Sequence, residues 1–329
     1  MKRRVIAEIG SCGGDLALAI DTAEAAVEAG AWMVKGQMYE ADRLVTRTAP
    51  TYGKSSIREP ATQHTAFRKA LTYDEWGAVA AAVPGQFFAS VFDIEACHDY
   101  PYQWIKIASA DITYRALIEA AAATGRKLIV STGGASRADI HRALTWINGV
   151  HPTLLACTLS YPTQPADANV ARLIALQEFH VPTGYSDHTR GTAAANVAFA
   201  LGATMVEKHF TITPGEGGDH DFAIGPDELS DIASGQEPTE AQMKVYGGSQ
   251  VIGPRITERR ARLLARRSLR AAAAIPIGTR ITKEMVAVLR PSGGMEPWLL
   301  YAFPEGPLGA YATRQLAVGD AITPDAFTR

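Results

Sequence analysis

Two histidines, His188 and His209, have the residue type and the spacing of a metal site. Each comes at the end of a short apolar run that is typical of a β-strand, and residues 191–201 between them have helical periodicity. Consecutive parallel strands of a barrel end side by side, so both imidazoles would lie at the same rim. Two imidazoles leave coordination positions for water, a carboxylate and substrate, which favours Mn²⁺, or alternatively Mg²⁺ or Co²⁺, as a Lewis acid over structural zinc. The alternative is a pair of satisfied core histidines.

Two lysines occur inside apolar strand runs, where a positive charge is costly unless it meets an anion. Lys35 lies in Met33-Val34-Lys35-Gly36-Gln37, and Lys106 lies between two isoleucines. If both side chains converge on one barrel mouth, they suit a dianionic ligand, such as a phosphate with a carboxylate. The alternative is that each lysine extends to the bottom of the barrel and reaches solvent there.

The run Ser131-Thr132-Gly133-Gly134 offers hydroxyls and backbone N–H groups at a helix start, an arrangement that cradles phosphate. In the loop after the eighth strand candidate, Asp219 rather than His220 is the functional candidate. Purely structural strand ends would be mostly small or apolar, whereas these are polar or ionisable. The other residues at the predicted strand ends are Glu8, Lys35, Gln37, Ser90, Lys106, Ser109, Cys157, Thr158, Ser186, His188 and His209.

A repeating pattern of strands and helices positions these residues. Eight strand candidates alternate with helices, which predicts an α/β fold, a (β/α)8 (TIM) barrel over residues 1–250. The polar stretch 38–71 is expected to be an insertion near the rim. The strand candidates are 5–9, 33–37, 87–90, 104–107, 128–131, 154–157, 183–185 and 205–209. Helical periodicity is clearest in 16–29, 73–82, 114–123, 137–147, 170–179 and 191–201.

The pattern changes after the barrel. Glycines and a proline break it near residues 247–254, and a linker over 251–266 follows, with a basic helical stretch at 257–267. Residues 267–329 have short strands and Gly/Pro turns, which predicts a small β-rich domain. A domain of this size is near the lower limit for an independent core, so we expect it to lean on the barrel or on a partner chain.

The composition is that of a globular protein and argues against a nucleic-acid-binding, membrane-spanning or disulfide-rich protein. A formal charge of −2 gives no broad basic surface for nucleic acid or anionic lipid. No apolar run approaches the ~20 residues of a membrane span, and the first apolar stretch breaks at Glu8, too soon for a signal peptide. The cysteines are widely spaced, with no disulfide or zinc pattern, so a cytoplasmic location is expected. They are Cys12, Cys97 and Cys157.

Taken in chain order, the motifs resemble those of the sialic acid (N-acetylneuraminate) synthases and their pseudaminic and legionaminic acid relatives. The tail, with Arg267-Ser268-Leu269 and Leu289-Arg290-Pro291, resembles the antifreeze-like (SAF) domain of that family. The resemblance covers essentially the whole chain. The combination of these motifs in this order is specific to the family, although single motifs are not. The barrel motifs are Glu8-Ile9-Gly10, Val34-Lys35-Gly36-Gln37, Lys106-Ile107-Ala108-Ser109, Ser131-Thr132-Gly133, Cys157-Thr158 with Tyr161-Pro162, Gly184-Tyr185-Ser186-Asp187-His188 and Glu207-Lys208-His209-Phe210-Thr211.

The resemblance implies a metal-dependent condensation of phosphoenolpyruvate with an aldose, in which phosphate leaves by C–O cleavage. His188 and His209 would bind the metal, Glu8 would act as acid/base, and Arg290 would reach the partner's barrel in a domain-swapped homodimer. Phosphoenolpyruvate would be held by Lys35, Ser90, Lys106, Ser109, Ser131, Thr132, Gly133 and Ser186. The acceptor sugar would be lined by Gln37, Asp111, Tyr161, Asp219 and Arg290.

Departures from the family pattern concentrate on the acceptor side. Ser11-Cys12-Gly13-Gly14 stands where the family usually has Asn-His and a glycine, and Leu159 stands where polar residues are common. We therefore expect an N-acetylmannosamine-like or a modified sugar, and a nonulosonate-type or other higher-carbon 2-keto acid product. One alternative is a phosphoenolpyruvate aldol synthase for a phosphorylated aldose, which needs a second phosphate site. Another is a non-catalytic sugar-binding relative, which should have lost metal or phosphate residues first.

Overall fold

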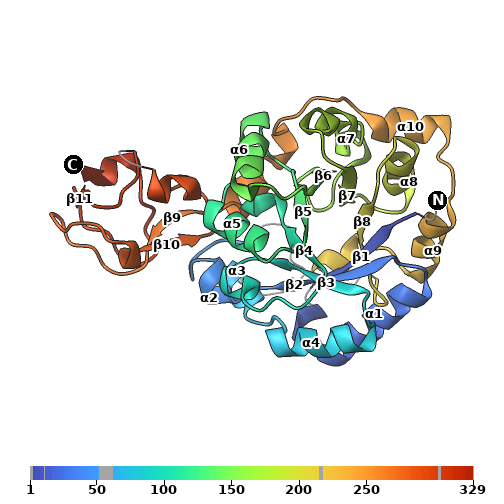
Figure 1. The fold of residues 1–329 in the computed structure, drawn as a ribbon, viewed down its shortest axis with the longest axis horizontal. Coiled ribbons are helices and arrows are strands. Elements are labelled where there is room, and N and C mark those ends of the chain that lie inside the picture. Colours follow the sequence, from blue (N-terminus) through green and yellow to red (C-terminus); the bar gives the residue numbers. More distant parts are fainter. Residues whose placement is uncertain (1–2, 11, 52–61, 215–217, 303–304, 329) are drawn as a thin grey trace.

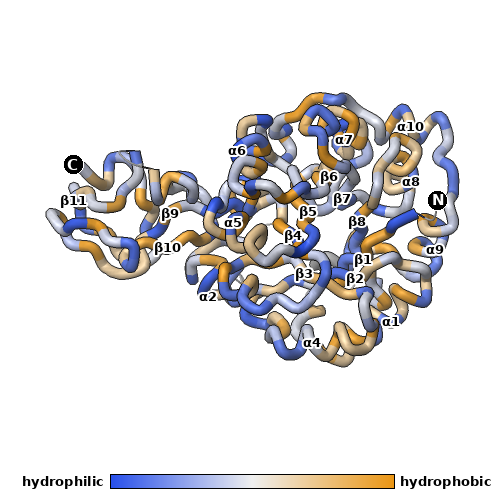
Figure 2. The backbone as a smooth tube through the Cα atoms, in the orientation of Figure 1, coloured by the Kyte–Doolittle hydropathy of each residue, from blue (hydrophilic) through white to orange (hydrophobic). Residues whose placement is uncertain are grey.

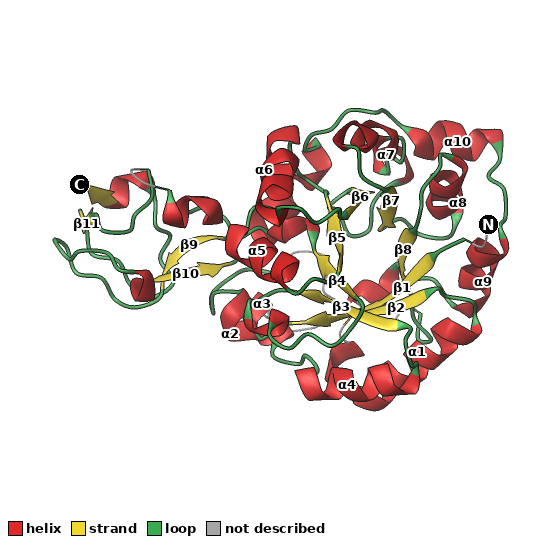
Figure 3. Ribbon diagram, viewed as in Figure 1, coloured by secondary structure: helices red, strands yellow, loops and turns green. Residues whose placement is uncertain are grey.

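A closed ring of parallel strands forms the first part of the molecule, and the strands neighbour one another in chain order (Figures 1 and 3). The computed structural model describes residues 3–10, 12–51, 62–214, 218–302 and 305–328. The predicted (β/α)8 barrel is confirmed. Its strands are β1 (Val5–Gly10), β2 (Met33–Met38), β3 (Phe87–Val91), β4 (Trp104–Ile107), β5 (Lys127–Ser131), β6 (Thr153–Cys157), β7 (Thr183–Asp187) and β8 (Val206–His209).

Helices surround the ring on its outside (Figure 3). Their alanine-rich faces pack on the strands, and caps fix several of their starts: the hydroxyl of Ser136 and the carboxylate of Asp139 form a reciprocal capping box on α6. The α-helices are α1 (Leu16–Glu28), α2 (Ala41–Leu44), α3 (Gln63–Phe67), α4 (Tyr73–Ala82), α5 (Arg115–Ala123), α6 (Arg137–Ile147), α7 (Arg172–Ala175), α8 (Ala193–Ala200), α9 (Pro226–Ser234), α10 (Glu240–Gly247) and α11 (Arg259–Ala265).

Short 3-10 turns connect many of these elements. The stretch 170–179, predicted as one helix, is divided between α7 and the 3-10 turn η5, which ends at His180 in the left-handed conformation (φ 55°). The 3-10 turns are η1 (Cys12–Gly14), η2 (Glu95–Cys97), η3 (Ser109–Asp111), η4 (Pro165–Asp167), η5 (Leu176–Phe179), η6 (Gly218–Asp221), η7 (Ile256–Glu258), η8 (Lys283–Met285), η9 (Pro297–Tyr301) and η10 (Pro324–Ala326).

The C-terminal part projects from one side of the barrel (Figure 1). Strand β9 (Ser268–Ala271) pairs antiparallel with β10 (Val286–Leu289), and β11 (Tyr311–Ala312) pairs with β12 (Phe327–Thr328). Hydrophobic stretches run along β10 and through the barrel (Figure 2). The small domain has its own cluster of buried apolar residues: Leu269, Ala271, Ile275, Met295, Leu300, Ala312, Leu316, Ile322 and Ala326.

The insertion after β2 lies where the two domains meet. It contains α2 and α3, whereas its residues 52–61 are outside the described part. The backbone of Arg290, just past β10, exchanges hydrogen bonds with α2 and the residues after it: its N–H donates to the Leu44 carbonyl at 3.0 Å, and its carbonyl accepts from the Thr46 N–H at 2.9 Å. The small domain therefore leans on the barrel through this insertion. Of the helices that the structure describes, none is long and apolar enough to cross a membrane.

Candidate active site

The residues inside the barrel form two layers. The lower layer is apolar and contains Ile6, Met33, Phe88, Trp104, Ile129, Leu155 and Met205. Side chains alternate along a strand, so the inward residue that follows each of these seven is two positions further on. Those residues are Glu8, Lys35, Ser90, Lys106, Ser131, Cys157 and Glu207, all of them buried. Because the chain runs toward the carboxyl ends of the strands, this polar layer lies at the barrel mouth, and both lysines lie there rather than at the bottom.

Glu8 is held from three sides on the β1–β2 part of the mouth. Its Oε1 accepts hydrogen bonds from the Gly10 N–H at 2.9 Å and from the Gln37 amide at 2.8 Å. Its Oε2 forms an ion pair with Lys35. The Lys35 ammonium also donates to the Ser90 hydroxyl at 2.8 Å. The predicted residues Glu8, Lys35, Gln37 and Ser90 therefore form one connected group, with the carboxylate and the ammonium oriented before any substrate binds.

Glu207 joins the two lysines, and we did not identify it as a site residue from the sequence. Its Oε2 lies 3.5 Å from the Lys106 ammonium and 3.8 Å from that of Lys35. Its Oε1 accepts a hydrogen bond from the Ser186 hydroxyl at 3.1 Å. Burial alone would raise the pKa of Glu207, but the attraction of Lys106 and Lys35 outweighs it and lowers the pKa. Burial lowers the pKa of Lys106, and Glu207 opposes that shift. The two-residue spacing from apolar Met205 is the signal that could have found Glu207.

The two histidines lie together on the other side of the mouth. The ring centroids of His188 and His209 are 5.4 Å apart, and β1–β8 pairing places His209 beside Glu8. Nδ1 of His188 lies 3.0 Å from the Thr158 carbonyl. A carbonyl can only accept, so in the neutral ring Nδ1 carries the hydrogen and Nε2 keeps its lone pair. Tyr161 packs against His188 with ring centroids 4.2 Å apart.

His209 has the protonation state that a metal ligand needs. Burial, followed by the neighbouring His188 and Lys35, holds the pKa of His209 well below its ordinary value. The ring is therefore neutral near pH 7, with a lone pair available. Among the described residues, no group of three His, Cys, Asp or Glu side chains is placed to hold a metal ion. His188 and His209 are therefore the two imidazole donors that this side of the mouth could offer to an ion.

The turns after β4 and β5 carry the residues predicted to hold phosphate, Ser109 and Ser131 to Gly133. The Gly133 N–H donates to the Ser109 hydroxyl oxygen at 2.9 Å. The Ser131 hydroxyl is buried and has no hydrogen-bond partner among the described residues. The Thr132 hydroxyl instead donates to the Leu155 carbonyl at 3.0 Å, so it ties the strands together. Ser131 and Ser109 therefore remain as the side-chain ligands that this segment can offer.

The predicted acceptor residues are spread over a wider area. Asp111 is fully buried, and its Oδ1 accepts from the Arg267 guanidinium at 2.6 Å. Its Oδ2 lies 3.9 Å from Arg290. Arg290 also lies over the rings of Phe67 and Phe92. Asp111 therefore links the barrel with the small domain. The side chain of Asp219 lies outside the described residues.

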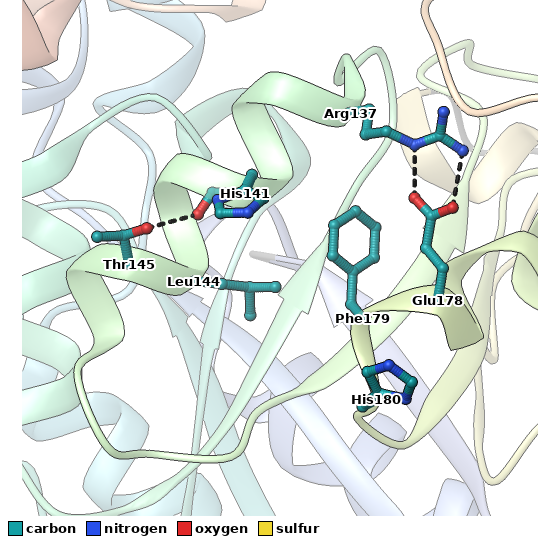
Figure 4. Close-up of a pocket in the computed structure, with 7 residues that line it drawn as sticks. All are labelled: Arg137, His141, Leu144, Thr145, Glu178, Phe179 and His180. Atoms are coloured by element: carbon teal, nitrogen blue, oxygen red, sulfur yellow. Dashed lines mark hydrogen bonds and ion pairs between the residues drawn. The ribbon is translucent and has the colours of Figure 1, made fainter.

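The open hollow in Figure 4 is a separate feature on the helical layer, between α6 and η5. Arg137 and Glu178 close one end of it with hydrogen bonds of 2.5 and 2.7 Å. Leu144 and Phe179 give it an apolar wall. None of the residues predicted for the active site lines it, so the barrel mouth remains the candidate active site.

Comparison with known families agrees with this geometry. A model described as the NeuB family matches residues 22–246, which is more than half of the chain. The chain belongs to the NeuB family. A SAF domain model matches residues 266–328, which contain β9 to β12 of this NeuB family member. The predicted resemblance to sialic acid synthases with a SAF tail is therefore confirmed.

Relatives along the whole length support the assignment. The N,N'-diacetyllegionaminic acid synthase of Legionella pneumophila is 32% identical, with 89% of this chain and 86% of the relative covered. The pseudaminic acid synthase of Helicobacter pylori is 30% identical, with 99% of this chain and 98% of the relative covered. The crystal structure of the spore coat polysaccharide biosynthesis protein SpsE of Bacillus subtilis superimposes with a TM-score of 0.80 at 26% identity, covering 100% of this chain and 96% of that one.

Proposed function

We propose that this NeuB family protein condenses phosphoenolpyruvate with an aldose to give a nonulosonate-type or other higher-carbon 2-keto acid sugar and phosphate. The observation that carries the proposal is the pair of buried lysines, Lys35 and Lys106, at one mouth, together with the Ser131 hydroxyl, for which the described part of the chain provides no hydrogen-bond partner. Glu8 and Glu207 lie beside these lysines in the structure, and the two ammonium groups with the buried Ser131 hydroxyl are donors that suit a small dianion. The names of the legionaminic and pseudaminic acid synthases support the reaction class.

The residues suggest how the reaction would proceed. Lys106, with Ser109 and Ser131, would hold the phosphate of phosphoenolpyruvate, while Lys35 would face its carboxylate. C3 of the enol would attack the aldehyde carbon, whose oxygen takes up a proton. Water would add at C2 and lose one proton, which leaves a C2 hydroxyl. Phosphate would then leave with the bridging oxygen and take up the proton of that hydroxyl as the C2 ketone forms. Glu8 would move these protons as acid/base, because Lys35 and Gln37 fix its carboxylate at the mouth.

A divalent cation fits the site as a cofactor, and Mn²⁺ is the ion we propose. His188 and His209 would hold it through neutral ring nitrogens, and it would supply Lewis-acid polarisation of the acceptor's aldehyde. Tyr161 beside His188, together with Gln37 and Asp219, would line the acceptor. A cytoplasmic location stays a prediction.

A phosphate-release assay tests the proposal. Phosphoenolpyruvate labelled with ¹⁸O at the bridging position is incubated with the protein, Mn²⁺ and a panel of 2-acetamido, free and phosphorylated aldoses. We expect phosphate release that depends on the aldose, with the label recovered in phosphate because the C–O bond breaks. Release only with 5-phosphorylated aldoses would support the alternative aldol synthase instead. Absence of release and of phosphoenolpyruvate binding would contradict the proposal.

Replacement of Lys106 by alanine should weaken phosphoenolpyruvate binding far more than acceptor binding. The variant loses a charge-assisted contact to a desolvated anion, worth about 1.5–3 kcal/mol, so its KM for phosphoenolpyruvate should rise about 10- to 150-fold. Lys127→Ala is the matched control, because Lys127 is exposed at the opposite end of a barrel strand. Steady-state kinetics with each substrate varied in turn measures the effect. A raised KM for the sugar alone would show that Lys106 serves the acceptor.

We further propose a domain-swapped homodimer in which Arg290 completes the acceptor site. In the single chain Arg290 lies near Asp111 of its own barrel. Domain swapping replaces such a contact with the same contact from a partner. Mixing an Arg290→Ala chain with a His188→Ala chain would then create one intact site per mixed dimer. With random pairing, about one quarter of wild-type activity per chain should return. If mixed dimers form and no activity returns, Arg290 acts within its own chain or has no role.

A further inference from the structure

We propose that the segment joining the two domains, residues 251–266, is part of the phosphoenolpyruvate site, with Glu258 as a positioning residue for the loops that hold the phosphate. This inference rests on the proposed function. It concerns a residue that lies 124 and 99 positions away in sequence from the two loop residues that it contacts, Gly134 and Leu159. Neither the family resemblance nor the spacing of the barrel motifs pointed to it.

Glu258 is a buried carboxylate whose oxygens are all engaged by backbone N–H groups. Its exposed fraction is 0%. Its Oε1 accepts hydrogen bonds from the Gly134 N–H at 2.7 Å and from the Leu159 N–H at 2.8 Å. Its Oε2 accepts from the Arg255 N–H at 2.7 Å. A single carboxylate oxygen, Oε1 of Glu258, therefore joins the turn after β5 to the turn after β6.

Those two turns are in direct contact with the phosphate ligands. A Cβ atom placed on Gly133 would lie 3.0 Å from the Ser109 hydroxyl oxygen and 3.2 Å from the Leu159 nitrogen. The Gly133 N–H also donates to Ser109. Ser109, Gly133 and Leu159 thus pack with no free space between them. A shift of either amide that Glu258 holds would displace the Ser109 hydroxyl.

The linker also holds Gly134 from other directions. The guanidinium of Arg266 donates to the Gly134 carbonyl at 3.0 Å. Gly134 has a φ of +62°, and a Cβ atom there would lie 2.8 Å from Cγ of Arg262. Residues 258–266 therefore contact Gly134 at its N–H, at its carbonyl and on the side where other residues carry a Cβ atom. That glycine follows the Ser131-Thr132-Gly133 run, so the linker fixes the end of the phosphate cradle.

The negative charge of Glu258 is balanced by a residue of the same chain. This observation supports a role in positioning the loops and not in binding phosphate. Arg172 lies 4.0 Å from Glu258, and its guanidinium also donates to the Cys157 carbonyl at 2.7 Å and to the Gly253 carbonyl at 3.3 Å. Gly134 and Leu159 donate their N–H groups to a carboxylate, so these amides are not donors to the substrate. The role of Glu258 is therefore to hold the loops in place. A buried acceptor that loses its side chain leaves both amides without a partner.

The test compares three variants with the wild-type protein. Glu258→Ala removes both loop contacts. Glu258→Gln keeps one oxygen that can accept from Gly134 and Leu159, and gives up the Arg255 contact and the negative charge that faces Arg172. Asp93→Ala is the matched control, since Asp93 is also buried and accepts a backbone N–H, from Ala96 at 2.8 Å; its other side-chain partners are Tyr73 and Arg43, and none of them belongs to the turns after β5 and β6. Calorimetric binding of phosphoenolpyruvate, KM and kcat for each substrate, and the unfolding midpoint are measured for all.

For Glu258→Ala we expect the Kd and KM for phosphoenolpyruvate to rise about tenfold or more, with the acceptor KM and the kcat at saturation changed less than about threefold. Glu258→Gln should stay within about threefold of wild type. Asp93→Ala should lower the unfolding midpoint without changing phosphoenolpyruvate affinity. This pattern separates positioning from a general loss of stability, which would affect Glu258→Ala and Asp93→Ala alike.

Unchanged phosphoenolpyruvate affinity in a folded Glu258→Ala protein would overturn the inference. Equal losses of affinity in Glu258→Ala and Asp93→Ala would do so as well. If Glu258→Ala does not fold, the phosphoenolpyruvate affinity of Arg266→Met is measured instead, and the same outcomes apply. This variant removes the donor to the Gly134 carbonyl and leaves Glu258 in place. The wild-type measurement distinguishes failure of the role proposed for Glu258 from failure of the proposed function. A wild-type protein that neither binds phosphoenolpyruvate nor releases phosphate contradicts the proposed function itself.

Discussion

Alanine at His188 or at His209 should lower kcat by about 10³-fold or more, because each change removes one of the two imidazoles that would hold a Lewis-acid cation, which is worth several kcal/mol at the transition state. EDTA should abolish activity of the wild-type protein, and Mn²⁺ or Mg²⁺ should restore it. The geometry that motivates this expectation is the 5.4 Å separation of the two rings at one mouth. The measurements are initial rates with and without added metal, and bound Mn²⁺ by electron paramagnetic resonance.

The control for this prediction is His64→Ala. His64 is also a buried histidine, but its Nε2 pairs with Asp42 at 2.8 Å in the insertion after β2, away from the histidine pair. It should keep its Mn²⁺ stoichiometry. Full turnover by metal-stripped wild-type protein would contradict the prediction, as would unchanged Mn²⁺ binding in both active-site variants.

Asp111→Ala should destabilise the protein by about 3–5 kcal/mol, because it leaves the Arg267 charge buried without its counter-charge. Arg267 is 2% exposed and Asp111 0%, and the pair meets at 2.6 Å. The guanidinium also lies over the Tyr114 ring, and its other hydrogen bonds among the described residues go to backbone carbonyls, such as that of Arg43 at 2.8 Å. Carbonyl groups cannot balance a full charge. Urea denaturation, followed by circular dichroism, gives the free energy of unfolding.

Two further variants separate charge burial from loss of contact. Asp111→Leu combined with Arg267→Met removes both charges and should cost less than Asp111→Ala alone. Glu119→Ala breaks an exposed pair with Arg115, 2.7 Å apart, and should cost about 0.3–0.5 kcal/mol. A loss below about 1 kcal/mol for Asp111→Ala would show that Arg267 is solvated or otherwise compensated.

Much of the site followed from local sequence pattern, for a physical reason. In a parallel barrel each short apolar run becomes a strand, and its last residues reach the mouth whatever the connecting loops do. Lys35, Lys106, His188 and His209 could therefore be placed together from their positions within such runs. The alternation of side chains fixed the inward direction of both lysines, and the apolar layer two residues earlier, with Met33 and Trp104, shows the same period.

Contacts between segments far apart in the chain were decided only by the tertiary structure. Glu207 was visible in sequence beside His209, yet its position between Lys35 and Lys106 depends on how β2, β4 and β8 face one another across the ring. Asp111 was predicted as an acceptor residue, and the structure shows it paired with Arg267, 156 positions later. Glu258 reaches Gly134 across 124 positions. The periodicity of apolar residues and the secondary-structure propensities depend on only a few neighbouring residues. The partner of a buried charge, in contrast, can come from any segment that packing brings within hydrogen-bond distance.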